Sequence, residues 1–295
     1  MIVNDRPNGG RLASAKEDGS SISVVIAVRN CVDTLQGCLD SVYEQTHRPL
    51  ELIVIDGAST DGTLELVARN GPALAYWESR ADRGIYHAWN KALRHATHEW
   101  ICFLGADDRL HAPDVLAHVA PSLQAAVGFC RVVYGGIDII DPSGTRRATF
   151  GEDWETARAS FRAGQMLPHA ATFHHRSLFA ERGAFDERFR IAGDYELLLR
   201  ELLEHEAIGL PDLVVVDVAE GGVSDRPETD GTRIREKHRA RRMHGLTDEP
   251  EWRSPEVLKA VIRAWIARNL GRRALTRLRD VSRRLRRRTD DPATS

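Results

Sequence analysis

Cysteines are few and scattered in this chain of 295 residues. Their spacing matches neither a disulfide framework nor the paired ligands of a metal site. The pattern fits a reducing compartment and predicts a cytoplasmic location. The four cysteines are Cys31, Cys38, Cys102 and Cys130.

Long apolar runs and targeting segments are also missing. No run approaches the roughly 20 residues needed to span a bilayer. The N-terminal stretch, MIVNDRPNGGRLASAKEDGSS, lacks the apolar centre of a signal peptide. We expect residues 1–20 to be a disordered lead-in.

Two common nucleotide-binding fingerprints are absent as well. A dinucleotide site needs Gly-x-Gly-x-x-Gly after the first strand, but the chain has Ala-Val-Arg-Asn-Cys-Val at 27–32. The Gly-Lys-Ser/Thr of a P-loop does not occur either. A nucleotide, if bound, is therefore held in another way.

What is present is an ordinary globular composition, with 42% hydrophobic and 28% charged residues and a net charge of −2. Over the first part of the chain, apolar β-branched runs alternate with helical spacing. This β-α-β-α-β-α-β order predicts an α/β fold with a parallel, doubly wound sheet. The expected strands are 22–28, 52–55, 74–77 and 100–104, followed by strands in 131–140, 166–175 and 213–218. The later helices expected are a short one over 176–182 and a longer one over 194–205.

The apolar run from Trp100 ends at Gly105 and is followed by two adjacent acids, Asp107 and Asp108. In an open α/β sheet, ligands bind beyond the carboxyl ends of the strands. Two carboxylates there suit a hard divalent cation. The alternative is that they only solvate the turn before a helix near Pro113.

Asp56 ends the second expected strand, before Gly57. Its carboxylate could accept hydrogen bonds from ribose hydroxyls or from a base N–H. The alternative is a turn-forming aspartate.

Several stretches taken together closely resemble the inverting glycosyltransferases with the GT-A fold, often called family 2. The resemblance covers roughly 21–225, and bacterial members of that family build capsule, O-antigen and other envelope glycans. It implies a Rossmann-like, mostly parallel sheet flanked by helices. The matching stretches are SVVIAVRN, VIDGASTDGT, ESRADRGIYHAWNKAL, FLGADD and PHAATFHHRSLFAERGAFDERFRIAGDYELLLR.

The chain departs from that family's pattern in two places. The usual Pro-Thr-Tyr-Asn after the first strand is Ala-Val-Arg-Asn at 27–30. The acidic motif, often D-x-D-D, has Gly105 at its leading position. Because glycine has no side chain to bind a metal, Asp107 and Asp108 must carry the site.

The resemblance also implies roles on the donor side. Asp82 is expected to contact the nucleotide sugar, and Asp107 the ribose. Asn90 and Lys91 would lie near the donor sugar, although a solvated helix face explains them equally well. The walls of the base and ribose pocket would be Val28, Asn30 and Asp56.

For the reaction itself, the resemblance implies that Asp108 holds Mg²⁺ or Mn²⁺ and that Asp194 is the catalytic base. An acceptor hydroxyl needs a base to take its proton, and a nucleoside diphosphate leaves readily only if its charge is stabilised. The alternative for Asp194 is a plain helix N-cap. His169, after Pro168, is a candidate for the acceptor cleft, or else a hydrogen-bonding residue of the core or surface.

The expected organisation is a lead-in over 1–20, a GT-A domain over 21–228, a helical basic extension over 229–288 and a disordered tail over 289–295. Residues 263–288 contain eleven arginines and one acid, interleaved with apolar residues. This pattern predicts contact with the anionic inner membrane surface. A partner helix, nucleic acid or plain solvent are the alternatives.

The predicted function is transfer of one sugar from a nucleotide-sugar donor to a glycan or lipid-linked acceptor, with inversion and with a metal. Two alternatives stay open. One is a nucleotidyltransferase, which would need a basic phosphate loop that Arg29 alone hardly supplies. The other is a catalytically inactive sugar-nucleotide-binding scaffold. We expect no nucleic-acid partner.

Overall fold

The computed structural model describes residues 2–4, 20–221 and 227–247. The chain divides into two compact units, Met1–Glu220 and Gly221–Ser295. The first unit carries every strand described below. The division lies slightly before the boundary at 228 that the sequence suggests.

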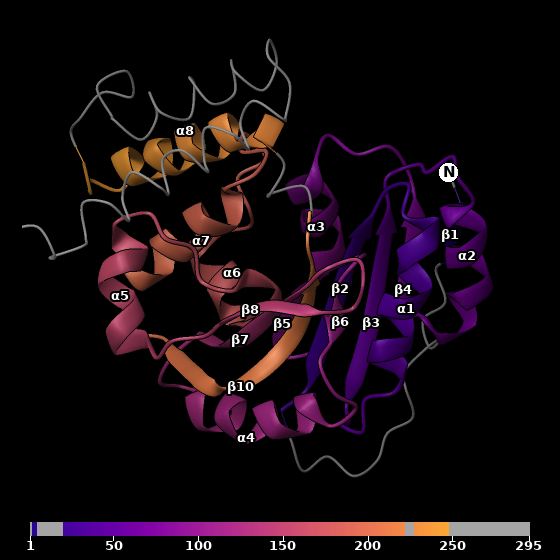
Figure 1. Ribbon diagram of the computed structural model, residues 1–295, viewed down its shortest axis with the longest axis horizontal. Helices are drawn as coiled ribbons and strands as arrows, with labels where there is room; N and C mark the ends of the chain where they lie inside the picture. The colour runs from indigo at the N-terminus through magenta and orange to yellow at the C-terminus, as the bar shows by residue number, and fades with distance from the viewer. Residues whose placement is uncertain (1, 5–19, 222–226, 248–295) are drawn as a thin grey trace, which may run out of the picture. The chain divides into compact units, whose positions relative to one another are not determined.

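The first unit alternates strands and helices in its first half and mixes them in its second (Figure 1). Its strands are β1 (Ile2–Asn4), β2 (Ile22–Val28), β3 (Leu50–Asp56), β4 (Tyr76–Ser79), β5 (Trp100–Gly105), β6 (Arg109–Leu110), β7 (Val132–Ile140), β8 (Arg146–Phe150), β9 (Thr172–His175) and β10 (Ile208–Ala219). Its α-helices are α1 (Val32–Tyr43), α2 (Thr63–Asn70), α3 (Ile85–Leu93), α4 (Val115–Ala126), α5 (Trp154–Arg162), α6 (Arg176–Arg182) and α7 (Gly193–Leu202).

These strands form one sheet in the order β1-β4-β3-β2-β5-β9-β7-β10-β6, and β8 pairs with β7. Strands β4, β3, β2 and β5 run parallel, as predicted. Strand β9 is antiparallel to both of its neighbours, β5 and β7, while β10 is parallel to β7. The sheet is therefore mostly parallel, in agreement with the predicted fold class.

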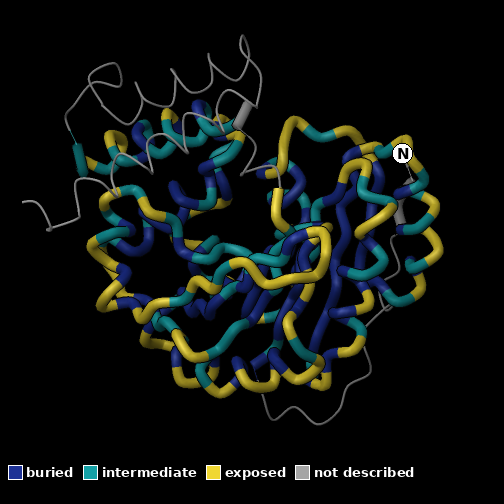
Figure 2. The backbone as a smooth tube through the Cα atoms, in the orientation of Figure 1, coloured by how far each residue is buried: buried dark blue, intermediate teal, exposed yellow. Residues whose placement is uncertain are grey.

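Successive side chains of each strand point to opposite faces of the sheet. Helices cover both faces and bury the apolar side chains there. One face carries Ile22, Val24 and Ile26 of β2, which join the core formed with α1, α2 and α4. On the opposite face, Phe103 of β5 packs against Trp89 of α3. The central strands are buried along most of their length (Figure 2), which is why they read as continuous apolar runs rather than alternating ones.

A buried carboxylate ties three of these strands together at the amino ends. Glu51 of β3 accepts hydrogen bonds from the hydroxyl of Ser23 in β2 (2.5 Å) and from the backbone and hydroxyl of Thr97, ahead of β5 (2.6 and 2.8 Å). These bonds satisfy an acidic group that is only 2% exposed.

The structure differs from the predicted elements in three respects. Residues Ile2–Asn4 form β1, which pairs antiparallel with β4, so this part of the expected disordered lead-in is a strand. The hairpin strand β8 and the helix α5 were not predicted. Helix α7 begins at Gly193, with Ala192 in the N-cap position, so Asp194 is its second residue rather than its cap.

The second unit contains α8 (Pro227–Met243), which agrees with the predicted helical character from about 229. Its Arg233 pairs with Asp230 one turn earlier. The basic stretch 263–288 and the tail 289–295 lie outside the described residues. Within the residues described, no helix combines the length and the apolar character that crossing a membrane requires.

Candidate active site

The parallel strands bring their carboxyl ends to one edge of the sheet. Val28 of β2 is in register with Asp56 of β3, and Asp56 with Ser79 of β4. Ala27 of β2 lies opposite Gly105 of β5. Residues that are far apart in the sequence, at the ends of four strands, therefore meet at this edge.

Asp56 is fully buried, and its carboxylate is held by the protein itself. It accepts hydrogen bonds from the hydroxyls of Ser59 and Ser79, both at 2.5 Å, and from the Ser59 backbone N–H. A ribose or base could reach this carboxylate only if one of these groups moved. In this structure, Asp56 positions the loop that follows β3.

Asn30 connects that loop to the loop after β2. Its backbone is left-handed, with φ of 54°, which asparagine tolerates better than most residues. Its N–H donates to the Ser59 hydroxyl and its side-chain oxygen accepts from the Thr60 N–H, both at 2.8 Å. The exposed Asn30 therefore lies where the two loops meet, whereas Val28 is 4% exposed.

Asp61 joins the starts of α1 and α2. Its carboxylate accepts from the N–H of Val32 (3.2 Å) and of Thr63 (3.0 Å), the first residues of the two helices. The Thr63 hydroxyl donates to it as well (2.6 Å). That hydroxyl bond is the main cause that lowers the pKa of Asp61. The loop formed by the motif DGASTDGT thus satisfies the first backbone N–H of both helices.

Lys91 and Asp82 belong to a compact charged cluster at the same edge. The Lys91 ammonium lies 2.5 Å from Glu78 and 2.7 Å from Asp82, and its side chain is only 13% exposed. His87 also contacts Asp82, at 2.9 Å. Burial opposes ionisation of Glu78, but the bond and charge of Lys91 outweigh it and lower the pKa of Glu78. Lys91 therefore does not lie on a solvated helix face.

Asn90 contacts the loop between α6 and α7 rather than this charged cluster. Its side-chain oxygen accepts from the Phe185 N–H (3.0 Å) and its amide donates to the Phe185 carbonyl (2.9 Å). The same amide donates to Glu187 at 3.2 Å. These bonds hold the loop between α6 and α7 in place, which is a different role from the donor-sugar contact expected of Asn90.

Asp107 and Asp108 follow β5, and both carboxylates fold back toward Gly105. A Cβ at position 105 would lie 2.5 Å from one Asp108 oxygen and 3.1 Å from one Asp107 oxygen. Asp108 is 8% exposed and accepts from the N–H of Ala219 (3.2 Å), at the end of β10. Burial and the neighbouring Asp107 charge raise the pKa of Asp108 to about 7. A buried carboxylate beside a like charge is the arrangement that a divalent cation stabilises.

A second group of side chains has ligand atoms close enough together to hold a metal ion. The ligand atoms of His111, Asp138 and Asp217 are all within 4.8 Å of one another. His111 contacts Asp217 at 2.7 Å, and Asp138 accepts from the Thr149 hydroxyl at 2.5 Å. No motif in the sequence singles these residues out, since they come from three separate strands or strand ends.

Asp194 lies against the first turn of α3. The Tyr86 hydroxyl donates to the Asp194 carboxylate (3.1 Å), as does the Tyr195 N–H (2.8 Å). A Cβ on Gly193 would come within 2.8 Å of the Tyr86 ring, so glycine permits this close approach. Burial and the Asp194 charge raise the pKa of Tyr86 well above its ordinary value, and the phenol therefore stays protonated as a donor.

His169 packs into a cluster of aromatic side chains from α3, β5 and β9. Its ring stacks on Trp89 and Phe103, with centroids 5.1 and 5.8 Å apart, and lies 5.3 Å from the ring of His174. The Nε2 atoms of both histidines are buried and have no hydrogen-bond partner among the described residues. Burial lowers the pKa of each to about 3. In this structure His169 is a neutral packing residue.

Helix α3 is what brings the predicted residues together. Tyr86 and Asn90, one turn apart, face Asp194 and the loop before α7. His87 and Lys91, also one turn apart, face Asp82 and Glu78. The i,i+4 spacing of the two pairs is visible in the sequence, but the partners of Tyr86 and His87 are not. Asp107 and Asp108 approach the same edge from β5.

Comparison with known proteins distinguishes a glycosyltransferase from a nucleotidyltransferase. The model of the family described as glycosyl transferase family 2 matches residues 23–189, more than half of the chain. The chain belongs to this family. It is therefore a glycosyltransferase, and the nucleotidyltransferase alternative loses its support.

A curated relative of this family 2 glycosyltransferase is a PGL/p-HBAD biosynthesis glycosyltransferase of Mycobacterium bovis. The two are 35% identical over 184 residues, which is 60% of this chain and 68% of the relative.

Two solved structures share the fold. One is S. aureus TarS 1-349 in complex with UDP-GlcNAc, with a TM-score of 0.59 and 17% identity over 84% of this chain and 74% of that one. The other is the mannosyltransferase PcManGT of Pyrobaculum calidifontis in complex with GDP-Man and Mn²⁺, with a TM-score of 0.58 and 21% identity over 90% and 79%. The chain spans 44% of a longer TarS structure.

The buried histidines of the family 2 glycosyltransferase predict a pH-dependent stability. An unfolded histidine titrates near 6.5, whereas His174 titrates near 3 in the fold. The unfolded state then binds more protons between these values, so stability is complete above pH 6.5 and falls as the pH drops toward 3. Each such histidine costs about 1.4 kcal/mol per pH unit in that window.

The measurement is urea unfolding of the wild type and of His174→Gln at pH 7 and pH 5. We expect the variant to lose about 1–2 kcal/mol less than the wild type over this interval. The control Phe179→Leu disturbs the same cluster without removing a titratable group, and should lower stability equally at both pH values. Parallel pH dependence of wild type and His174→Gln would refute the assignment.

Proposed function

We propose that this family 2 glycosyltransferase moves one sugar from a nucleotide-sugar donor to a hydroxyl of a glycan or lipid-linked acceptor, with inversion at the anomeric carbon. The observation that carries the proposal is the placement of Asp194 on α7 and of the Asp107–Asp108 pair after β5. Its support is that Tyr86, in the first turn of the helix α3 that follows β4, donates a hydrogen bond to the Asp194 carboxylate.

In the proposed reaction, an acceptor hydroxyl oxygen attacks the anomeric carbon of the donor sugar. The bond from that carbon to the diphosphate oxygen breaks, and the Asp194 carboxylate takes the hydroxyl proton. Attack from the face opposite the leaving group inverts the configuration. Tyr86, which stays protonated, orients the Asp194 carboxylate through its hydrogen bond.

Asp108, together with Asp107, is proposed to hold Mg²⁺ or Mn²⁺. The fit rests on the buried Asp108 beside the like charge of the exposed Asp107, and on the space that Gly105 leaves beside both carboxylates. A bound cation of this kind stabilises the negative charge that develops on the departing diphosphate. The Mn²⁺ in the mannosyltransferase complex supports this choice of metal.

On the donor side, Val28, Asn30 and Asp82 are proposed to contact the nucleotide. Asn30 supports this because it is exposed where two loops meet. Asp82 supports it because its carboxylate lies close to Gly57, the residue after Asp56: a Cβ on Gly57 would be 3.4 Å from it. Asp56 would act through the Ser59 loop that it holds. The UDP-GlcNAc and GDP-Man bound by the two structural neighbours support a nucleotide-sugar donor.

The proposed base is tested by Asp194→Asn. Asparagine can accept the same hydrogen bonds from Tyr86 and Tyr195 but cannot take a proton at neutral pH. We expect unchanged melting temperature and donor affinity, and a single-turnover transfer rate lower by about 10²–10⁴. The matched control is Asp212→Asn at an exposed position of β10, which should transfer normally. Near-normal transfer by Asp194→Asn would assign the base to another group, such as Glu196.

The metal assignment is tested by Asp108→Asn, which can keep the bond to Ala219 but removes the charge. Calorimetric titration with Mn²⁺ in the presence of UDP or GDP should show binding at least about tenfold weaker, a loss of about 1.4 kcal/mol, and excess EDTA should abolish transfer by the wild type. The comparison variant is His111→Ala. If that variant loses Mn²⁺ and Asp108→Asn does not, the metal belongs to the group of His111, Asp138 and Asp217.

The basic stretch 263–288 is proposed to bind anionic membrane surfaces from the cytoplasm, where a lipid-linked acceptor would be reached. This proposal rests on charge and apolar interleaving in the sequence. The full chain should sediment with phosphatidylglycerol vesicles at low salt, and added salt should release it, because exposed charges are screened beyond about 10 Å at 0.1 M. A chain truncated at 251 should not sediment. Absence of binding by the full chain at low salt would refute the proposal.

A further inference from the structure

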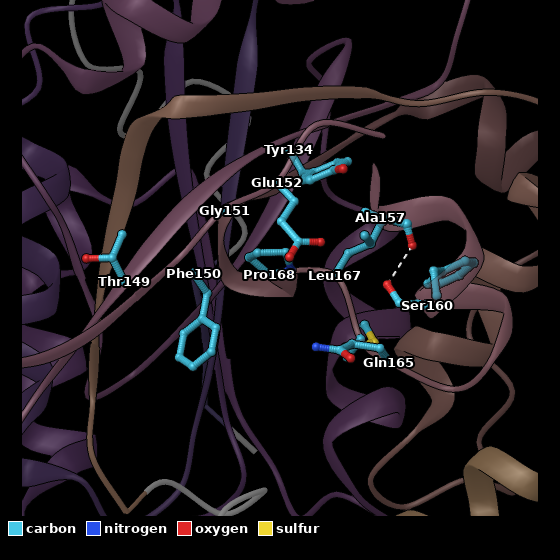
Figure 3. A pocket seen from close by; sticks show the side chains of 12 residues that line it. Tyr134, Thr149, Phe150, Gly151, Glu152, Ala157, Ser160, Gln165, Leu167 and Pro168 are labelled. Atoms are coloured by element: carbon cyan, nitrogen blue, oxygen red, sulfur yellow. Dashed lines mark hydrogen bonds between the residues drawn. The ribbon is translucent and has the colours of Figure 1, made fainter. Parts of the chain in front are cut away.

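A small pocket opens between β8, α5 and the segment 165–168, on a part of the fold that the proposed reaction does not use. Its volume is about 150 Å³. A cavity of that volume accepts a six-membered carbon ring, since an engineered apolar cavity of about 150 Å³ binds benzene. Figure 3 shows the side chains around it, with Glu152 and Phe150 on one side and Ser160 and Gln165 on the other.

Glycines allow the chain to form this pocket. A Cβ on Gly151 would lie 3.0 Å from the Cα of Gly136, so the end of the β8 hairpin lies directly against β7. The backbone then leaves the sheet and directs Glu152 away from it, toward Pro168 and Leu167 (Figure 3). Helix α5 supplies the opposite wall, and its Ser160 hydroxyl donates to the Ala157 carbonyl.

The lining combines one exposed aromatic ring with groups that bind hydroxyls. Phe150 is 51% exposed, although it is a large apolar residue. Glu152 offers a carboxylate and Gln165 an amide that can both donate and accept. The Tyr134 hydroxyl, also in the lining, is buried and has no hydrogen-bond partner among the described residues. A ring with a CH face and several hydroxyls complements this combination.

The charge of the lining excludes the donor's phosphates from this pocket. Among its lining residues, Glu152 is acidic and none is basic. A diphosphate or an acidic sugar would therefore meet a like charge with no cation to offset it. The pocket is suited to a neutral sugar.

The pocket is also connected to the proposed reaction centre. Phe161, in its lining, accepts a hydrogen bond at its carbonyl from the Tyr195 hydroxyl (2.8 Å), and their rings lie 5.2 Å apart. Tyr195 follows Asp194 directly. On the other side, Pro168 of the lining precedes His169. The α5 wall of the pocket is thus in contact with the residue next to the proposed base.

We infer that this pocket binds a neutral sugar unit of the acceptor, resting its ring on Phe150 and accepting hydrogen bonds from its hydroxyls at Glu152. The inference rests on the proposed function, because it takes Asp194 as the group that faces the acceptor. It adds to that proposal that the acceptor is itself a glycan or glycoside, and that an uncharged sugar of it is recognised apart from the donor.

The test uses saturation-transfer NMR on the full chain with a set of neutral probes, namely the methyl pyranosides of glucose, mannose, galactose, rhamnose and N-acetylglucosamine. Methyl glucuronide is the charged comparison. At least one neutral probe should bind, and the glucuronide should bind more weakly than methyl glucoside. Phe150→Ala and Glu152→Gln should each weaken the binding probe about tenfold, which is the size of one lost contact of about 1.4 kcal/mol.

The matched control is Phe129→Ala, which removes a phenylalanine that is 75% exposed and lies outside the pocket. Its probe affinity should equal that of the wild type, and the melting temperatures of all variants confirm folding. Binding of no neutral probe, or equal binding by wild type and both pocket variants, would overturn the inference. Failure of the proposed function would appear separately, as absence of UDP or GDP binding by the wild-type chain.

Discussion

The packing of α3 against one face of the parallel sheet, with its first turn just after β4, is the constraint on which the site depends. One side of this helix holds the α6–α7 loop through the two hydrogen bonds between Asn90 and the Phe185 backbone. The adjacent side places Lys91 between Glu78 and Asp82. A helix fixed on both sides determines where Tyr86 lies, and Tyr86 in turn contacts Asp194. The distance between the donor edge and the proposed base is therefore set by helix geometry rather than by flexible loops.

The acidic residues at this edge are of two physical kinds. Asp56, Asp61 and Asp82 are satisfied by hydroxyls, backbone N–H groups or Lys91, so they have the partners that a structural carboxylate needs. Asp108 has backbone hydrogen bonds from Ala219 and Gly105 and a like-charged neighbour, and burial together with that neighbouring charge raises its pKa. This contrast separates carboxylates whose hydrogen-bonding capacity is filled by the protein from Asp108, the proposed metal ligand. Sequence position alone does not separate them, because Asp56 and Asp108 both come at or just after strand ends.

The sequence predicted the parallel half of the sheet well because its central strands are continuous apolar runs, as in Ile22–Val28, and each connection is a helix with clear spacing. The edge strand β4, with the sequence YWES, lies two residues later than the predicted 74–77. It predicted the second half poorly. Strand β8 is short and its side chains are mostly exposed, so RRATF carries no burial pattern. Asp61 and Asn90 were visible as polar residues, but their partners come from distant segments that only the fold brings near. His169 was expected in an acceptor cleft, whereas the burial of its Nε2 among aromatic rings depends on Trp89 and Phe103, far away in sequence.

The reversal of β9 between two parallel pairs explains why the two halves of the site differ in kind. On the β2–β5 side, successive βα loops reach one edge by local connections, and they supply the loops and the acids proposed for the donor. On the other side of β9, the sheet continues through β7, β10 and β6, and the hairpin strand β8 pairs with β7 off this path. Close contacts such as that of Gly151 with Gly136 allow this hairpin to form a wall of its own. A sheet built in this way can keep the edge proposed for the nucleotide while the wall proposed for the acceptor changes with the length and sequence of a single hairpin and α5. That wall is then the part of the fold where the proposed acceptor specificity is physically easiest to alter.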